Sequence, residues 1–455
     1  MLLLGSVVFY VWGEGEYVVL LALLVAFNYG AGILLERMQG RGRTAVLSSA
    51  ITGDLLVLGI FKYSPLVGNT VSYFRHLASL PPLTPIKTHL PLGISCFTFQ
   101  LISYVVDIYR GKIRAEHAPS RLATYIMMFP HLIAGPIVRY ADIAAELRKR
   151  QVTLDRVGLG IQYFIVGLCQ KVLIANTVAQ AADTVFALPP DQLRSLAAWL
   201  GTLAYTLQIY FDFCGYSNMA IGLAFLLGFH FPKNFDYPYG ARSITEFWRR
   251  WHMTLSFWFR DYVYIALGGN RKGQLKTVRN LIIVFFLTGL WHGASWTFVI
   301  WGLYHGLFLL LERVGFGRIL ERIPTVLRVA YTVFVVMIGW VFFRAATFTQ
   351  ALVFFKAMFG RPATVPETPP TLLWLTPEII VALAAGILFS FPIVPRLLDS
   401  LGRQRIARAT MFYPEARLDT LFVHPLPVSV LISGLALCIV LLASGSLNPF
   451  LYFRF

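Results

Sequence analysis

Long apolar runs, separated by short loops rich in lysine and arginine, make up most of the chain. An apolar run of about 20 residues can cross a bilayer as an α-helix, which bonds its backbone polar groups within the segment. Hydrophobic residues make up 57% of the 455 residues and charged residues only 13%, whereas soluble domains carry about 25% charged residues. We therefore predict an all-α integral membrane protein that forms one domain over residues 1–455.

The basic residues are spread among these loops rather than gathered in one patch. The net charge of +17 therefore follows the pattern of cytoplasmic membrane-protein loops and does not indicate a nucleic acid partner. Residues 230–280 carry nine Lys or Arg against three acidic residues, which predicts a cytoplasmic location. Single cysteines in apolar stretches predict neither a disulfide nor a metal site: Cys96, Cys169, Cys214 and Cys438.

Hydropathy predicts about ten or eleven crossings. The run 89–108 is interrupted by Pro91, Gly93 and Asp107 and is expected to pack against protein. The prolines of 122–140 favour two half-helices or a re-entrant turn over one span. The loop 361–378 is expected outside, and the arginines within 396–417 are expected on the basic side. The opening apolar run is too short to cross and lacks the features of a signal peptide. The expected crossings include 17–35, 45–61, 158–179, 196–213, 215–229, 281–311, 329–343, 379–391 and 428–443.

The basic segment also carries large apolar residues at three- and four-residue steps, which predicts one helix lying in the membrane interface. Just before this segment, small residues favour close packing of a helix against its neighbour. The interfacial stripe consists of Phe247, Trp251, Leu255, Trp258 and Tyr262, and the small residues are Gly215, Gly222 and Gly228.

Three histidines follow in and after this segment: His252, His292 and His305. A titratable group at membrane depth is costly and is therefore a functional hypothesis. A neutral imidazole in a dry cavity can take the proton from a hydroxyl while that oxygen attacks an ester or thioester carbonyl. Acyl transfer is the reaction that this favours, because GxSxG, HExxH, Walker A and GxGxxG motifs are missing from the sequence.

Each of these residues also has a structural interpretation. His292 could make an interhelical hydrogen bond, and spacing alone does not decide between this and catalysis. His305 is expected to be a structural partner at a helix end, and His252 an interfacial polar residue. Arg249 and Arg250 could bind lipid headgroups or the phosphates of a coenzyme. Asp107 and Lys171 are expected to be paired or snorkelling, and His131 could line a cavity or bond to the broken backbone around it.

Six strings support a resemblance to a known family. They are ITEFWRRWHMTLSFWFRDYVYIALGGNRKG, GLWHGASWTFVIWGLYHG, PLGISCFTFQLISYVVDIYRG, FPHLIAGPIVR, GYSNMAIGLAFLLGF and FLYFRF. In their order along the chain they resemble the membrane-bound O-acyltransferase (MBOAT) family, and within it the branch of bacterial alginate O-acetylation proteins.

The resemblance implies a multi-helix bundle around a central funnel or tunnel, with re-entrant and interfacial helices. It also implies that the family's two signature histidines fall on His292 and His252, that acetyl-CoA is the co-substrate, and that no cofactor or metal is bound. Acetyl would move across a bacterial inner membrane towards a polysaccharide such as alginate, with periplasmic or membrane-tethered acetyltransferase partners. The resemblance leaves open a D-alanyl transferase for teichoic acids that uses a carrier protein, and the residues leave open a proton-coupled transporter or flippase.

Overall fold

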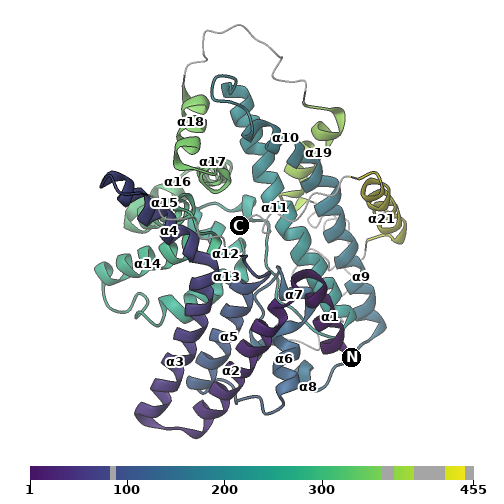
Figure 1. Cartoon of the computed structure of the whole chain (residues 1–455). Coiled ribbons are helices and arrows are strands. Elements are labelled where there is room, and N and C mark those ends of the chain that lie inside the picture. The colour runs from purple at the N-terminus through teal and green to yellow at the C-terminus, as the bar shows by residue number, and fades with distance from the viewer. Residues whose placement is uncertain (82–88, 361–373, 394–425, 446–455) are drawn as a thin grey trace.

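The computed structural model describes residues 1–81, 89–360, 374–393 and 426–445, which form helices and no strand (Figure 1). The α-helices are α1 (Leu2–Glu14), α2 (Tyr17–Arg37), α3 (Gly40–Leu58), α4 (Ser64–Leu77), α5 (Ile94–Tyr109), α6 (Pro119–Met127), α7 (Phe129–Leu132), α8 (Tyr140–Arg148), α9 (Leu154–Cys169), α10 (Asn176–Phe186), α11 (Ser195–Leu226), α12 (Ile244–Arg250), α13 (Met253–Phe259), α14 (Gln274–His292), α15 (Trp296–Leu311), α16 (Gly317–Arg322), α17 (Thr325–Arg344), α18 (Phe348–Phe359), α19 (Pro377–Phe389) and α21 (Val428–Ala443). Wider π-helical turns are η1 (Gly59–Tyr63), η2 (Gln170–Ala175), η4 (Arg260–Tyr264) and η5 (Glu312–Phe316), and η3 (Pro238–Gly240) is a 3₁₀ turn.

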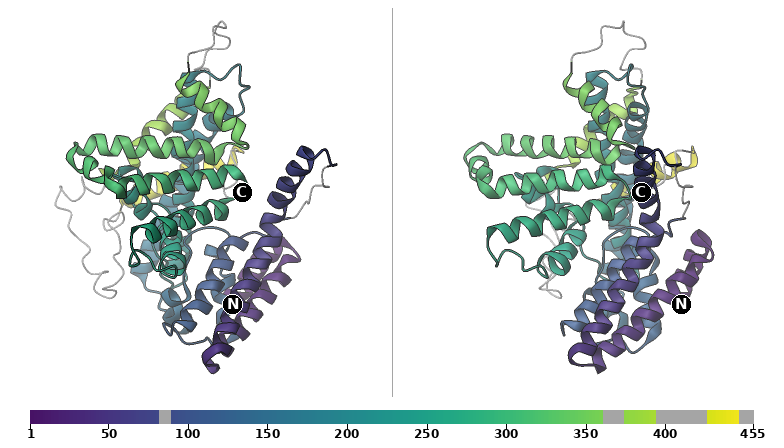
Figure 2. Two further views of the ribbon diagram at one scale, coloured as in Figure 1. Left: turned by 90° about the vertical axis from the view of Figure 1, so that its left-hand side faces the viewer. Right: turned by 60° about the vertical axis from the view of Figure 1, so that its left-hand side comes forward.

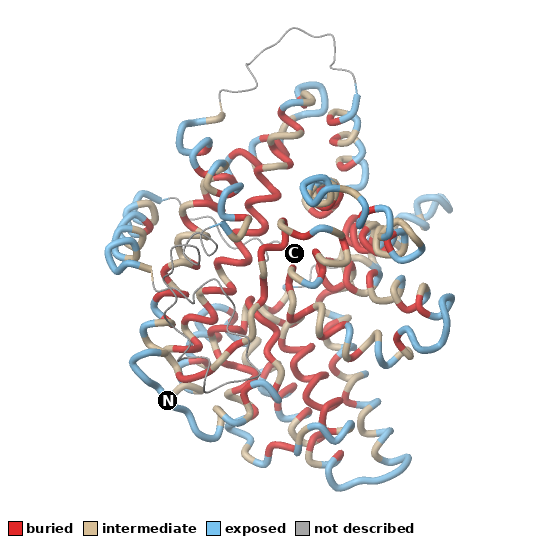
Figure 3. The backbone as a smooth tube through the Cα atoms, turned by 180° about the vertical axis from the view of Figure 1, so that it is seen from behind, coloured by how far each residue is buried: buried red, intermediate tan, exposed pale blue. Residues whose placement is uncertain are grey.

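Six continuous helical segments in the described ranges are long and apolar enough to cross a membrane, and five shorter helices are also apolar. These segments confirm an all-helical, multi-pass membrane protein. Buried residues follow the central helices, and exposed residues gather at the periphery (Figure 3). Two expected features, the arginines of 396–417 and most of the loop 361–378, lie outside the described residues.

The second expected crossing, 45–61, is longer than predicted. The chain continues from α3 through η1 into α4, so that one helical segment runs over 40–77. The π-helical turn η1 lies directly before Pro65, whose ring would clash with the carbonyl four residues earlier in a regular α-helix. The widened turn therefore lets the helix pass a proline that was expected to lie beyond its end.

The expected crossings 196–213 and 215–229 are wrong, because they form one helix, α11. Glycines allow α11 to touch α9: a Cβ on Gly215 would lie 2.6 Å from the carbonyl oxygen of Gly167, and one on Gly222 would lie 2.6 Å from that of Gly160. This confirms the close packing predicted for two of the three glycines. Gly228 instead follows the helix with a φ of 80°, a left-handed turn that glycine adopts without strain.

The expected single crossing 281–311 is also wrong. The chain reverses at Gly293, and α14 and α15 pack against each other as a hairpin. Together with α17 they lie side by side, steeply inclined to α2 and α3 (Figure 2). Close approach requires small residues, since a Cβ on Gly302 would lie 2.2 Å from the carbonyl oxygen of Phe285. His292 is therefore the last residue of a helix and not the middle of a crossing.

The break predicted within 122–140 is confirmed. Helix α6 ends at Met127, the single turn α7 contains Pro130, and non-helical backbone leads from it to α8. This segment is largely buried, in agreement with the rule that irregular backbone at membrane depth is packed inside protein.

Replacing Gly222 with Ala should destabilise the protein, because the new methyl group would meet the backbone of α9. We expect a loss of about 1–3 kcal/mol, measured as a lower thermal unfolding midpoint in detergent. The matched control is Gly158→Ala in α9, where nothing lies within 4 Å of the added Cβ. An unchanged midpoint for Gly222→Ala would contradict the close contact.

Candidate active site

The two histidines singled out in the sequence meet inside the protein. The ring centroids of His252 and His292 are 6.3 Å apart, and these residues are 1% and 2% exposed. They come from different breaks in the helices: His252 lies between α12 and α13, and His292 ends α14. The fold thus brings together two imidazoles that are forty positions apart in the sequence.

His252 owes its position to a strained turn. Its φ of 41° and ψ of 55° are left-handed, a conformation that costs a residue with a side chain about 1–3 kcal/mol and that clusters at functional sites. The predicted interfacial helix is therefore wrong, because the break divides it into α12 and α13. All five residues of its apolar stripe are buried in the protein, so the stripe packs against other helices and not against lipid.

Asn234 holds this turn from a neighbouring segment. Its carbonyl oxygen accepts from the backbone N–H of Met253 at 2.9 Å, and its side-chain oxygen accepts from the hydroxyl of Thr254 at 2.9 Å. Its amide nitrogen donates to Ser217 on α11 at 3.1 Å. The backbone that follows His252 is thus tied to α11, which stabilises the strained conformation. Spacing in the sequence gave no signal for Asn234.

Aromatic side chains surround the histidine pair. The ring of His292 lies 4.9 Å from Trp301 and 5.3 Å from Phe343, and Trp291 is 5.0 Å from His292 and 5.6 Å from His252 between ring centroids. Such walls exclude water and make the setting of the imidazoles dry. Within the described residues, both ring nitrogens of His252 are buried without a hydrogen-bond partner, which leaves them able to bind a substrate group.

His305 lies within α15 and not at a helix end, which corrects the prediction. It is buried between Phe247 and Trp301, whose ring centroids lie 6.2 and 5.3 Å from its own. Trp301 separates it from His292, so it belongs to the packing around the pair. His131 is likewise buried, with Phe231 at 5.1 Å.

A cavity of about 570 Å³ opens beside this cluster, between α12, α13, α14, α15, α16 and α17. Among the described residues that line it are Trp248, Arg249 and Thr288, the last of these one helical turn before His292. Neither His252 nor His292 is among the lining residues. Trp301 intervenes, since it contacts His292 at 4.9 Å and Trp248 at 5.6 Å between ring centroids.

The two arginines before His252 differ in their surroundings. Arg249 is exposed and lines the cavity. Arg250 does not line it, and its guanidinium donates to the carboxylate of Glu246 at 2.6 Å. Glu312, also at the cavity, accepts from the backbone N–H groups of Ile244 and Thr245 at 2.7 and 2.9 Å and so fixes the start of α12. Its role depends on a contact 67 residues away, which no sequence pattern signals.

Comparison with protein families decides the class. A model of the membrane-bound O-acyltransferase (MBOAT) family matches residues 112–351, more than half of the chain, including both members of the histidine pair. The chain belongs to this family. It is a membrane-bound O-acyltransferase with the helical membrane architecture predicted for it.

Curated relatives of this MBOAT chain are named for different polymers: alginate, peptidoglycan and teichoic acid. It is 43% identical to a probable alginate O-acetylase of Pseudomonas aeruginosa, over 79% of this chain and 69% of that protein. It is 36% identical to a peptidoglycan O-acetyltransferase of Helicobacter pylori, over 79% of this chain and 73% of the other. Identity to a teichoic acid D-alanyltransferase of Bacillus subtilis is 29%, over 58% of this chain and 67% of that one.

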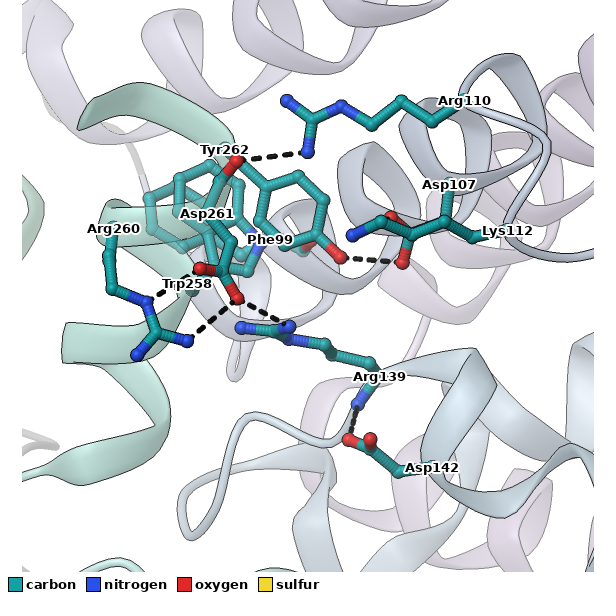
Figure 4. A network of polar contacts seen from close by, with 10 residues as sticks. All are labelled: Phe99, Asp107, Arg110, Lys112, Arg139, Asp142, Trp258, Arg260, Asp261 and Tyr262. Carbon is teal, nitrogen blue, oxygen red and sulfur yellow. Dashed lines mark hydrogen bonds and ion pairs between the residues drawn. The ribbon is translucent and has the colours of Figure 1, made fainter. Parts of the chain in front are cut away.

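A polar network joins the turn η4 to the N-terminal helices (Figure 4). Asp261 of η4 bonds to Arg139 at 2.9 Å and to Arg260 at 2.7 Å. Tyr262 donates to Asp107 of α5 at 2.6 Å. The pairing expected for Asp107 is thus confirmed, as is that of Lys171, which forms a buried ion pair with Asp212 of α11.

The pKa of Asp261 makes this network sensitive to pH. Burial alone would raise the pKa of the Asp261 carboxyl, but hydrogen bonds from Arg260 and Arg139 outweigh burial and hold it below its ordinary value of 3.8. A carboxyl whose pKa is lower in the folded state stabilises the fold above its unfolded pKa, and this stabilisation is lost as the pH falls through the folded pKa.

Asp261→Asn should therefore lower the thermal midpoint of the detergent-extracted protein at neutral pH. The difference from the unaltered protein should narrow as the pH is lowered below the ordinary Asp pKa of about 3.9. Asp191→Asn, in an exposed loop, is the control and should leave the midpoint unchanged at each pH. A difference for Asp261→Asn that is constant with pH would show that the carboxylate charge does not contribute.

Proposed function

We propose that this MBOAT protein moves acetyl from cytoplasmic acetyl-CoA towards hydroxyl groups of an exported polysaccharide such as alginate, across a bacterial inner membrane. The observation that carries the proposal is the dry pair of His252 and His292 beside a cavity with an arginine at its wall. The alginate and peptidoglycan O-acetyltransferases among the relatives support acetyl as the group and an envelope polymer as the acceptor.

In the proposed reaction His292 is the general base or proton relay. It takes the proton from the acceptor hydroxyl, the oxygen attacks the thioester carbonyl, and the C–S bond breaks. The proton then passes from the imidazolium to the leaving thiolate, so that an ester and a free thiol result. His252 orients His292 or the acyl group, and His305 supports the pair through Trp301. Periplasmic or membrane-tethered partners complete delivery to the polymer.

The cavity beside the pair is the proposed entrance for the donor. Four of the described arginines line it, Arg249, Arg260, Arg313 and Arg328. Of these, Arg249 lies closest in sequence to His252 and suits the phosphates of coenzyme A, because a guanidinium binds phosphate oxygens with two parallel hydrogen bonds. Trp248 and Trp301 must turn aside for a thioester to reach His292. Arg250 is the weaker candidate, since Glu246 already engages it.

Replacing His292 with Ala should abolish acetyl transfer while the protein remains inserted and folded. Membranes that contain the partners, supplied with labelled acetyl-CoA and a polysaccharide acceptor, measure the transfer. His76→Ala, on the exposed surface of α4, is the matched control and should keep normal activity. Near-normal transfer by His292→Ala at normal protein levels would refute the proposed role.

Arg249→Ala should raise the KM for acetyl-CoA by about tenfold, which corresponds to the loss of a charge-assisted hydrogen bond, with a smaller change in kcat. Arg250→Ala is the neighbouring control, and its KM should change less because Arg250 does not line the cavity. Equal KM values for the two variants would contradict the assignment of phosphate binding to Arg249.

A D-alanyl transferase remains the second candidate, because teichoic acid D-alanyltransferases are among the relatives. It would take its acyl group from a carrier protein and not from acetyl-CoA. Transfer of label from a D-alanyl carrier protein, and none from acetyl-CoA, would favour this candidate.

A further inference from the structure

A lysine from the N-terminal helices reaches the end of the helix that carries His292. Lys62 lies in η1, is 6% exposed, and donates from its ammonium to the carbonyl oxygen of Trp291. It also donates to the hydroxyl of Ser95 at 3.0 Å and lies 5.7 Å from the centroid of the Trp291 ring. Residue 62 precedes the segment 112–351 that matches the family model.

The environment of this charge is unusual. A buried ammonium is costly unless its donors are bonded, and within the described residues no carboxylate forms an ion pair with Lys62. Its partners are instead the hydroxyl of Ser95 and a carbonyl oxygen in the last turn of α14. Carbonyls in the last turn accept no hydrogen bond within the helix, and the helix dipole places partial negative charge there. The positive charge of Lys62 is thus stabilised by the C-terminal end of α14.

Trp291 connects that helix end to both histidines. Its ring lies 5.0 Å from His292 and 5.6 Å from His252 between centroids. Its indole N–H donates to the carbonyl oxygen of Ser95 at 3.4 Å. Lys62 and Ser95 therefore hold the backbone and the ring of Trp291, and the residue that follows is His292.

The next residue provides a neutral counterpart to Lys62. The hydroxyl of Tyr63 donates to the carbonyl oxygen of Leu290 at 2.9 Å. Two consecutive residues of η1 thus bond two consecutive carbonyls of α14, one with a charged donor that also contacts Trp291 and the other with a neutral donor. Comparing variants of Lys62 and Tyr63 therefore distinguishes a residue that positions the histidines from one that only caps the helix.

We propose that Lys62 is a positioning residue for acyl transfer, which fixes Trp291 and the end of α14 so that His292 faces His252 correctly. The proposal rests on the proposed function of this site. A misplacement of about 1 Å can cost 100-fold in rate. Because Lys62 acts through Trp291, its loss should affect the chemical step more than the binding of the donor.

The test compares Lys62→Met, Ser95→Ala and Tyr63→Phe by kcat and KM for acetyl-CoA, with the thermal midpoint in detergent as the measure of folding. Lys62→Met keeps the length of the side chain but removes the charge, and should lower kcat by about 10- to 100-fold with little change in KM. Ser95→Ala, which removes one acceptor of Lys62, should lower kcat less. Tyr63→Phe should keep kcat within about threefold.

The proposal is overturned if Lys62→Met and Ser95→Ala keep kcat within threefold of Tyr63→Phe, or if Tyr63→Phe loses as much kcat as Lys62→Met. A loss that appears in KM alone also overturns it. If Lys62→Met does not fold, Ser95→Ala against Tyr63→Phe decides. Unaltered protein that transfers no acetyl would instead reject the proposed function, so the two failures are distinguishable.

Discussion

Backbone groups freed at helix breaks inside the protein must find hydrogen-bond partners there, because lipid offers none. Both histidines of the central pair lie at such breaks. Asn234 bonds the turn after His252, and Lys62 bonds the carbonyl of Trp291, the residue before His292. The same hydrogen bonds that make interrupted backbone tolerable therefore also fix the two imidazoles, so that the stability of the core and the geometry of the site depend on one set of contacts.

This dependence links parts of the chain that are distant in sequence. Lys62 comes from the N-terminal helices, Asn234 from the loop after α11, and Glu312 from the turn after α15. Each bonds the backbone of a segment near the pair and not a reacting group. A change in the packing of any of these helices would thus move a histidine, even though the residues that changed would not touch the substrate.

Hydropathy and proline positions predicted the membrane class, most helical segments and the break near Pro130, because these follow from local composition. The histidines were recognisable from the cost of burying them. The left-handed turn at His252 and the reversal at Gly293 were missed, since the helical spacing of apolar residues continues through the first and an apolar run continues through the second. Hydropathy measures affinity for the membrane interior and not the direction of the chain. The contacts of Lys62 and Asn234 join remote segments, which single-sequence patterns do not encode.

The separation of the cavity from the histidines has a physical rationale. In the proposed reaction, a thioester held in a wet site would be open to hydrolysis, so exclusion of water until the acceptor hydroxyl is in place would favour transfer. Trp301 and Trp248 form this barrier. Within the described residues, the indole N–H groups of both are buried without a hydrogen-bond partner. Turning these rings aside breaks no hydrogen bond in this state, and a donor that offers an acceptor to either indole would gain one. In the proposed reaction, the barrier that the donor has to open is therefore held by ring packing and not by hydrogen bonds of these indoles.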